Sequence, residues 1–291
     1  MNSFQYISPI NEFEYFRPSV LEEALNLMSE YGNSCRVIAG GTDLTIALKN
    51  GEIPKAIIDI SNLKQLKYIK EDNESVRIGS LTTFDEIFRS GIILKSAQCL
   101  SEAAYNVGTW QIRNLATIGG NIANASPAAD SAPPLIVLDS MVKVESSNGR
   151  HEAGIMEMFT GPKRSSLKPG ELITEIQFRK NLQSRSSWSR VGRRNANTIS
   201  VVSVAVKALV EDNVFKEARI GLGAVGPTPI FAERASNYLV GRNVSLNSIE
   251  EAASIATKES SPISDVRGSR EYRLIMVNLL VKRLLTKVVG I

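Results

Sequence analysis

Apolar and polar positions follow a helical period near the start of the chain and again at its end. Over residues 20–28 the apolar side chains fall on one helical face, and Gly32 stops the run. Ser19 and Glu22 have the spacing of a capping box in front of this face. Over residues 274–288 apolar side chains form one stripe of a longer helix. Both segments are predicted to be amphipathic helices that bury one side against a core.

Shorter apolar runs between these helices alternate with turn signals, which is typical of a protein that mixes helices and strands. Thr82 and Thr83, followed by acidic residues three positions on, mark a further helix start. Pro133 and Pro134 fit the first turn of a short helix, where a proline removes no helical hydrogen bond. The pattern predicts strands at 36–39, 56–60, 141–145, 200–210 and 214–222, and helices at about 43–49, 94–106, 135–138, from the cap Ser248 onward, and 270–288.

The composition is that of an ordinary globular protein, and it argues against several classes of function. The 291 residues suffice for about two domains, and the net charge of +4 is spread without a basic block, which argues against nucleic-acid binding. No apolar run approaches about 20 residues, so we expect no membrane segment. The N-terminus Met1–Tyr6 lacks the pattern of a secretory signal. We therefore expect a cytoplasmic protein.

Cysteine and histidine are too few for metal or nucleophile chemistry. Cys35 and Cys99 are the only cysteines, so the chain cannot by itself ligate an iron–sulfur cluster or a four-ligand zinc ion. His151 is the only histidine and follows a polar stretch typical of a hairpin turn, which disfavours a Ser-His-Asp hydrolase. We predict no metal site and no catalytic acid, base or nucleophile in this chain.

Two glycine pairs carry the strongest chemical signal. They lie in residues 39–43 (Ala-Gly-Gly-Thr-Asp) and 117–121 (Thr-Ile-Gly-Gly-Asn). A glycine pair admits positive φ and has no Cβ atoms, so its backbone N–H groups can approach an anion closely. One such pair is more often an ordinary turn, but two with similar neighbours favour a pyrophosphate held from both sides. We expect positive φ at Gly41 and Gly120.

A third glycine-rich segment, Gly221–Gly226, matches the spacing of the dinucleotide fingerprint but not its context. Pro227 and Pro229 follow at once, so no helix begins there to face a pyrophosphate. No Walker-type loop occurs elsewhere in the chain. The segment is predicted to be a strand end, and any dinucleotide is expected to bind outside a Rossmann fold.

The segments around the glycine pairs resemble the FAD-binding medium subunit of molybdenum hydroxylases, the family of xanthine dehydrogenase, carbon monoxide dehydrogenase and aldehyde oxidoreductase. The resemblance implies an α+β fold with a vanillyl-alcohol-oxidase-type (PCMH-type) FAD-binding domain at 1–180, made of α/β subdomains at about 1–60 and 61–180. It also implies a C-terminal α/β domain with antiparallel sheet and helices at 187–291. The matching residues are 37–44, 111–122, 126–130, 170–173, 193–194 and 223–230, so the resemblance extends over nearly the whole chain.

The same resemblance implies which residues bind FAD. The two glycine segments would offer backbone donors to the pyrophosphate, and Val107 would line the same cleft. Asp130 would accept hydrogen bonds from ribityl or ribose hydroxyls. Leu172 would contact the flavin, and Arg190 would place a cation near it, which favours the anionic reduced form. The implied cofactor-binding residues are Val37, Ile38, Ala39, Gly40, Gly41, Thr42, Asp43, Leu44, Val107, Thr117, Ile118, Gly119, Gly120, Asn121, Asp130, Leu172 and Arg190.

For function, the resemblance implies an electron-transfer subunit with non-covalent FAD, since neither glycine segment contains a histidine or cysteine that could carry a covalent flavin. The molybdenum cofactor would lie on a large partner and [2Fe-2S] clusters on a small partner, in a dimer of heterotrimers. The acceptor would be NAD or another compound, because Asn195, Ala196 and Asn197 stand where relatives often carry an acid. Two other functions fit the same residues: a self-sufficient FAD oxidoreductase and a non-catalytic nucleotide-binding protein.

Overall fold

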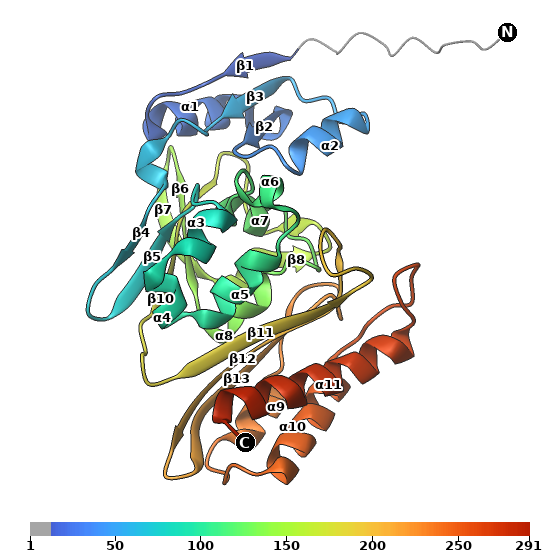
Figure 1. Cartoon of the computed structure of the whole chain (residues 1–291). Helices are drawn as coiled ribbons and strands as arrows, with labels where there is room; N and C mark the ends of the chain where they lie inside the picture. The colour runs from blue at the N-terminus through green and yellow to red at the C-terminus, as the bar shows by residue number, and fades with distance from the viewer. Residues whose placement is uncertain (1–12) are drawn as a thin grey trace, which may run out of the picture.

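The computed structural model describes residues 13–291, which form three main sheets arranged one after another along the molecule, with helices between and beside them (Figure 1). The segment Met1–Tyr6, which lacks the pattern of a secretory signal, lies outside the described residues. None of the helices in the described range is long and apolar enough to cross a membrane. Within that same range, no group of three or more His, Cys, Asp or Glu side chains is placed to hold a metal ion.

The first sheet is parallel and has the strand order β1-β3-β2. Its middle strand is buried along its length, and Ala24, Leu25 and Met28 of the first helix belong to the same core as Ile58. The apolar face predicted at 20–28 therefore packs inward at Ala24, Leu25 and Met28, whereas Val20 precedes the helix and is exposed. The elements are β1 (Glu14–Phe16), α1 (Leu21–Tyr31), a 3-10 turn (Gly32–Ser34), β2 (Cys35–Ile38), α2 (Leu44–Lys49) and β3 (Ala56–Asp59).

The second sheet is antiparallel, with the order β4-β5-β10-β6-β7, and a group of short helices packs against it. Phe84, Leu100, Ile118 and Leu135 from these helices share a core with the strands. The hairpin predicted before His151 forms between β6 and β7. The strands are β4 (Ile69–Glu71), β5 (Ser75–Gly79), β6 (Met141–Ser146), β7 (Gly149–Gly154) and β10 (Leu172–Arg179), with a separate hairpin of β8 (Phe159–Gly161) and β9 (Arg164–Ser165). The helices are α3 (Phe84–Arg89), α4 (Gly91–Ser96), α5 (Gln98–Asn106), α6 (Trp110–Arg113), α7 (Ile118–Ala123) and α8 (Ala132–Val137), with 3-10 turns at Lys64–Leu66 and Ile155–Met158.

The third sheet is antiparallel, with the order β11-β12-β13-β14, and lies between two groups of helices (Figure 1). α9 and α11 pack on one face, whereas α5 and α8 of the preceding part pack on the other. The segment at 221–226 is a strand end, as predicted, and a Cβ on Gly221 would lie 2.6 Å from the Pro133 carbonyl oxygen of α8. The elements are β11 (Arg185–Gly192), β12 (Ser200–Glu211), β13 (Val214–Gly223), β14 (Ile230–Phe231), α9 (Glu233–Leu239), α10 (Leu246–Glu259) and α11 (Arg270–Val289).

Several helix ends differ from the predictions made from the sequence. Ser19 does not cap α1, because the helix begins only at Leu21 and the Ser19 N–H donates to Glu23 at 2.9 Å instead. The helix predicted at 94–106 breaks at Ala97, where the backbone leaves the helical region, and becomes α4 and α5.

The start of α10 also differs from the prediction. Its cap is Ser245, whose hydroxyl accepts the Ser248 N–H at 3.1 Å. The predicted cap Ser248 lies three positions inside the helix, where its own hydroxyl donates to the Asn243 carbonyl at 3.0 Å. Ser245 and Ser248 are both residues that commonly cap a helix, and the packing of the folded chain determines which of them does so.

Candidate functional site

A groove of about 870 Å³ runs between the first and second parts of the chain. One wall is the turn from β2 to α2, and the other is formed by α7, the β8–β9 hairpin and the start of β10. This volume lies within the range of roughly 300–1,000 Å³ that is typical of cofactor sites. Every residue predicted to bind the cofactor lines the groove except Val107, Ile118, Asp130 and Arg190.

The turn from β2 to α2 presents a row of free backbone donors to this groove. The N–H groups of residues 40–44 donate no hydrogen bond to any residue in the described part of the chain, although the Gly41 carbonyl accepts from Thr45 at 3.0 Å. Gly41 has a φ of +69°, as expected, which lets the backbone turn sharply between strand and helix. Successive free N–H groups of this kind form a concavity that binds anions.

The second glycine pair is built differently, because its N–H groups are already hydrogen-bonded. Thr117 caps α7, and its hydroxyl accepts the Gly120 N–H at 3.2 Å. The Gly119 N–H donates to the Ser80 carbonyl at 2.9 Å. Gly120 therefore lies inside a helix, and the positive φ expected there is wrong. The need for glycine at 119 comes from packing instead, since a Cβ there would lie 2.6 Å from the Ser80 Cβ.

Residues that flank the second glycine segment contact the first one, and these contacts set the width of the groove. The Asn124 side-chain amide donates to the Asp43 carboxylate at 3.0 Å, across 81 residues of sequence. Gly40 packs against the backbone just before α7, where a Cβ would overlap the Leu115 carbonyl. The free donors of the first turn are thereby held opposite the surface formed by α7.

Comparison with known protein families identifies the family of the chain that contains this groove. The family described as the FAD binding domain in molybdopterin dehydrogenase matches residues 11–178, and the CO dehydrogenase flavoprotein C-terminal domain matches residues 188–288. The chain belongs to this family of FAD subunits. It is thus the FAD-binding component of a multi-subunit oxidoreductase of the molybdenum hydroxylase class.

Relatives of the FAD subunit match over nearly their full length. The nicotinate dehydrogenase FAD-subunit of Eubacterium barkeri is 33% identical over 282 residues, covering 94% of this chain and 95% of that protein. The xanthine dehydrogenase FAD-binding subunit of Escherichia coli O157:H7 is 30% identical over 280 residues, covering 95% and 96%. Among solved structures, carbon monoxide dehydrogenase from Hydrogenophaga pseudoflava matches with a TM-score of 0.93 and 28% identity, covering 97% of this chain and 99% of that chain. The predicted α+β fold is therefore confirmed.

The groove of the FAD subunit fits its cofactor. FAD is a dinucleotide with two negative charges on its pyrophosphate, and free N–H groups in a glycine turn are suitable donors for such a group. The wall at Gly40 and Gly41 has no side chain to keep a phosphate at a distance. The predicted FAD contacts of the groove residues stay predictions. The N–H groups of Gly119 and Gly120 already donate hydrogen bonds within the chain, so any contact of these two glycines with FAD would involve other atoms.

Asp130 and Arg190 lie outside the groove and bind each other. Arg190 Nη1 is 2.8 Å from the Asp130 carboxylate, and the Ser200 hydroxyl donates to the other carboxylate oxygen at 2.6 Å. Burial raises the pKa of Asp130 to about 6, and the Arg190 charge opposes that rise. The network joins the loop before α8 to β11 and β12. Both oxygen atoms of the Asp130 carboxylate therefore already accept a hydrogen bond within the chain. A contact of either residue with FAD stays a prediction.

The other predicted residues differ in how close they lie to the groove. Leu172, at the start of β10, lines it. Val107 ends α5, and its carbonyl accepts from Arg113 at 3.3 Å. Ile118 is fully buried in the core of the second part. The structure thus assembles the two glycine segments and Leu172 around one groove, whereas Val107 and Ile118 do not line it.

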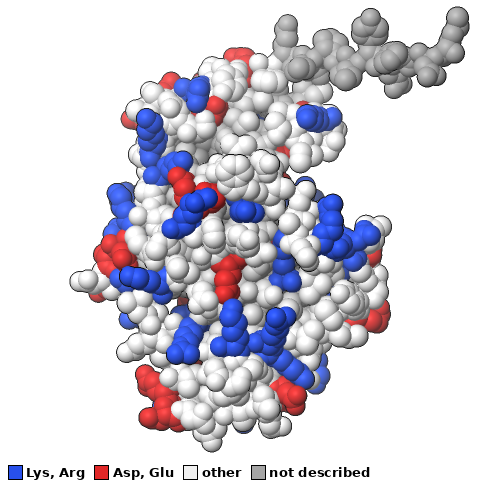
Figure 2. Space-filling model, viewed as in Figure 1, with Lys and Arg blue, Asp and Glu red and all other residues white. Residues whose placement is uncertain are grey.

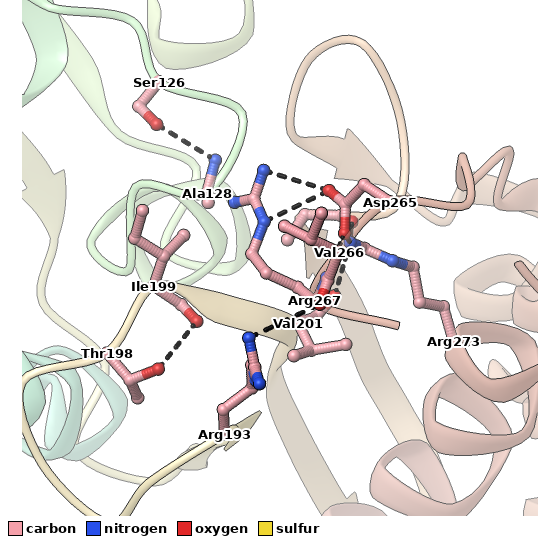
Figure 3. A network of polar contacts seen from close by, with 11 residues as sticks. Ser126, Ala128, Arg193, Thr198, Ile199, Val201, Asp265, Val266, Arg267 and Arg273 are labelled. Carbon is pink, nitrogen blue, oxygen red and sulfur yellow. Dashed lines mark hydrogen bonds and ion pairs between the residues drawn. The ribbon is translucent and has the colours of Figure 1, made fainter. Parts of the chain in front are cut away.

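The paired arginines that carry part of the resemblance hold backbone segments of the C-terminal part together. Arg193 reaches the Val266 carbonyl at 3.5 Å (Figure 3), and Arg194 donates to the Asn197 carbonyl at 2.7 Å. Figure 3 also shows Asp265 between Arg267 and Arg273, both of which pair with it. These arginines are engaged within the chain.

Sequence reasoning missed several residues that line the groove, among them Ser80, Asn124, Lys163 and Glu171. Lys163 follows a glycine and a proline, which signal a turn, but nothing in the sequence placed this turn beside the glycine pairs. Charged side chains elsewhere are mixed in sign: on the face in Figure 2, basic and acidic groups are interspersed. This agrees with the small net charge of +4.

Proposed function

We propose that this FAD subunit binds FAD non-covalently in the groove and relays electrons from [2Fe-2S] clusters of a partner to NAD or another acceptor. The observation that carries the proposal is the row of free N–H groups at residues 40–44, which faces the surface of α7 across a groove of cofactor size. FAD, when bound, supplies a group able to take up electrons singly and release them in pairs. The chain's own residues bind and orient it, and none is required as an acid or base toward the organic substrate.

The proposed partners follow from the side chains that the subunit offers. Cys35 and Cys99 are both buried, in separate cores, and cannot share a cluster. Burial also raises the pKa of the Cys99 thiol to about 12. The [2Fe-2S] clusters of the proposed relay would therefore lie on another chain.

The names of two relatives support partners of this kind. The carbon monoxide dehydrogenase medium chain of Hydrogenophaga pseudoflava and the nicotine 6-hydroxylase medium subunit of Paenarthrobacter nicotinovorans are each one component of a larger enzyme. We propose a large subunit with the molybdenum cofactor and a small subunit with two [2Fe-2S] clusters, assembled as a dimer of heterotrimers. Within this chain we propose domains at 1–180 and 187–291, in line with the family matches that end at 178 and begin at 188.

The experiment that tests the proposal compares the FAD-loaded chain alone with the chain plus its two partners. Dithionite should bleach the flavin of the isolated chain, whereas purines, aldehydes and carbon monoxide should not. Adding the partners should make bleaching depend on one of those substrates. Bleaching of the isolated chain by a substrate would instead identify a self-sufficient oxidoreductase. A chain that binds FAD but never changes redox state with its partners present would be a nucleotide-binding protein.

The acceptor is tested separately from the donor. If NAD accepts the electrons, NADH should reduce the flavin of the isolated FAD-loaded chain by the reverse reaction. If NADH leaves the flavin oxidised while dithionite reduces it, the acceptor is a compound other than NAD.

A further inference from the structure

The groove contains one cation whose charge is not already paired. Five charged side chains line it, and with two cations and three carboxylates their net charge is −1: Arg36, Asp43, Glu52, Lys163 and Glu171. Arg36 forms an ion pair with Glu52. The other two carboxylates accept hydrogen bonds from neighbouring amide groups. Lys163 remains, and its ammonium makes no ion pair or hydrogen bond with any of residues 13–291.

Lys163 is held at the groove by an unusual backbone geometry. It lies in the turn between β8 and β9, and its N–H donates at 3.0 Å to the carbonyl of Ala125, which follows the end of α7. Both residues have positive φ, +55° for Lys163 and +46° for Ala125. A lysine with positive φ costs roughly 1–2 kcal/mol of backbone strain relative to glycine. A glycine at this position would avoid that strain. The strained turn fastens the hairpin tip to the segment that follows the second glycine pair.

A dianion brought into this groove needs a compensating charge. The N–H groups of residues 40–44 supply partial positive charges, but the side chains around them sum to −1. A lysine ammonium is a mobile point charge with three donors and binds phosphate oxygens well. We infer that Lys163 is a cofactor-binding residue that pairs its ammonium with the phosphates of the ADP half of FAD. The inference rests on the proposed FAD site and adds a side-chain anchor to the backbone donors.

The test uses the full chain freed of FAD, with FAD and ADP as probes. Lys163→Gln removes the charge and keeps the strained turn, so it should weaken both probes roughly tenfold, as expected for one exposed charge-assisted hydrogen bond. The loss should shrink as salt is raised, because salt screens the wild-type ion pair. Lys163→Arg should restore most of the affinity. Lys168→Gln, a nearby lysine that does not line the groove, is the matched control and should bind like wild type.

A second variant separates binding from folding. Lys163→Gly removes the charge and also relieves the positive φ, so its thermal midpoint without FAD should equal or exceed that of wild type while its FAD affinity falls. If Lys163→Gln binds FAD and ADP like wild type, the inference is overturned. The same holds if Lys163→Arg fails to restore binding, which would make the lysine a structural residue. If wild type itself binds no FAD, the proposed function fails before this inference is reached.

Discussion

Gly40 offers the sharpest test of how the groove is built, because its packing partner is backbone that cannot rotate away. A Cβ at this position would overlap the carbonyl of Leu115, two residues before the second glycine segment. Relief requires the backbone of Gly40 and that of Leu115 to move apart by about 2 Å, since non-bonded atoms settle near 3.5–4.0 Å. Gly40→Ala is therefore expected to displace the turn that holds the free N–H groups without removing any of them.

The expected loss of FAD affinity follows from the number of N–H groups that can no longer donate to the pyrophosphate. A hydrogen bond to a charged acceptor is worth roughly 1.5–3 kcal/mol, and two of the five donors moved out of range would cost roughly 3–6 kcal/mol of binding. That corresponds to a Kd for FAD raised by roughly 10²–10⁴-fold. Gly41→Ala should have a smaller effect, because its penalty is the strain of a positive φ, about 1–2 kcal/mol.

The measurement is equilibrium dialysis of FAD against the FAD-free chain, with circular dichroism to show that each variant is folded. Gly91→Ala is the matched control: this glycine has negative φ and no atom within 4 Å of a built Cβ. It should bind FAD like wild type. A Gly40→Ala chain that is folded and has a Kd within threefold of wild type would refute the argument that contact between the two turns positions the donors.

Two further predictions concern the cofactor link and the buried carboxylate. Trichloroacetic acid should release all flavin into the supernatant, because no cysteine or histidine lines the groove; colour left in the pellet would show a covalent bond. Burial raises the pKa of Asp130 from 3.8 to about 6, so between these values the native state binds a proton that the unfolded chain has released. The stability from this site is present below about pH 4 and is lost as pH rises to about 6. The unfolding free energy of wild type relative to Asp130→Asn should therefore fall by up to roughly 3 kcal/mol between about pH 4 and pH 7 in denaturant titrations, and a flat difference would contradict the shift.

Local chemistry explains which parts of the structure could be predicted from sequence. Gly41 lies in the short turn between β2 and α2, so its positive φ follows from its neighbours. The same holds for Thr83, whose capping box with Glu86 forms as the spacing indicates. The motifs that resemble the family predicted the fold of the whole chain, because they are spread over all its parts.

Contacts between distant segments explain what the sequence could not show. The second glycine pair reads like the first, but its N–H groups are used because Ser80, far away in sequence, places a carbonyl against Gly119. Asp130 and Arg190 were assigned separately to the cofactor, whereas they meet across 60 residues and neutralise each other. Neither pairing leaves a periodic or compositional signal in a single sequence.

The close fit between α8 and the third sheet means that the two family modules share a buried surface. The family matches end at 178 and resume at 188, which suggests a natural cut. Yet Trp188 and Ala205 belong to the same core as Leu135, and the backbone at Gly221 rests on Pro133. A recombination event that exchanged only the C-terminal module would have to match a buried surface already shaped by its original neighbour. Successful chimaeras among such subunits should therefore carry their α8 along with the sheet that covers it.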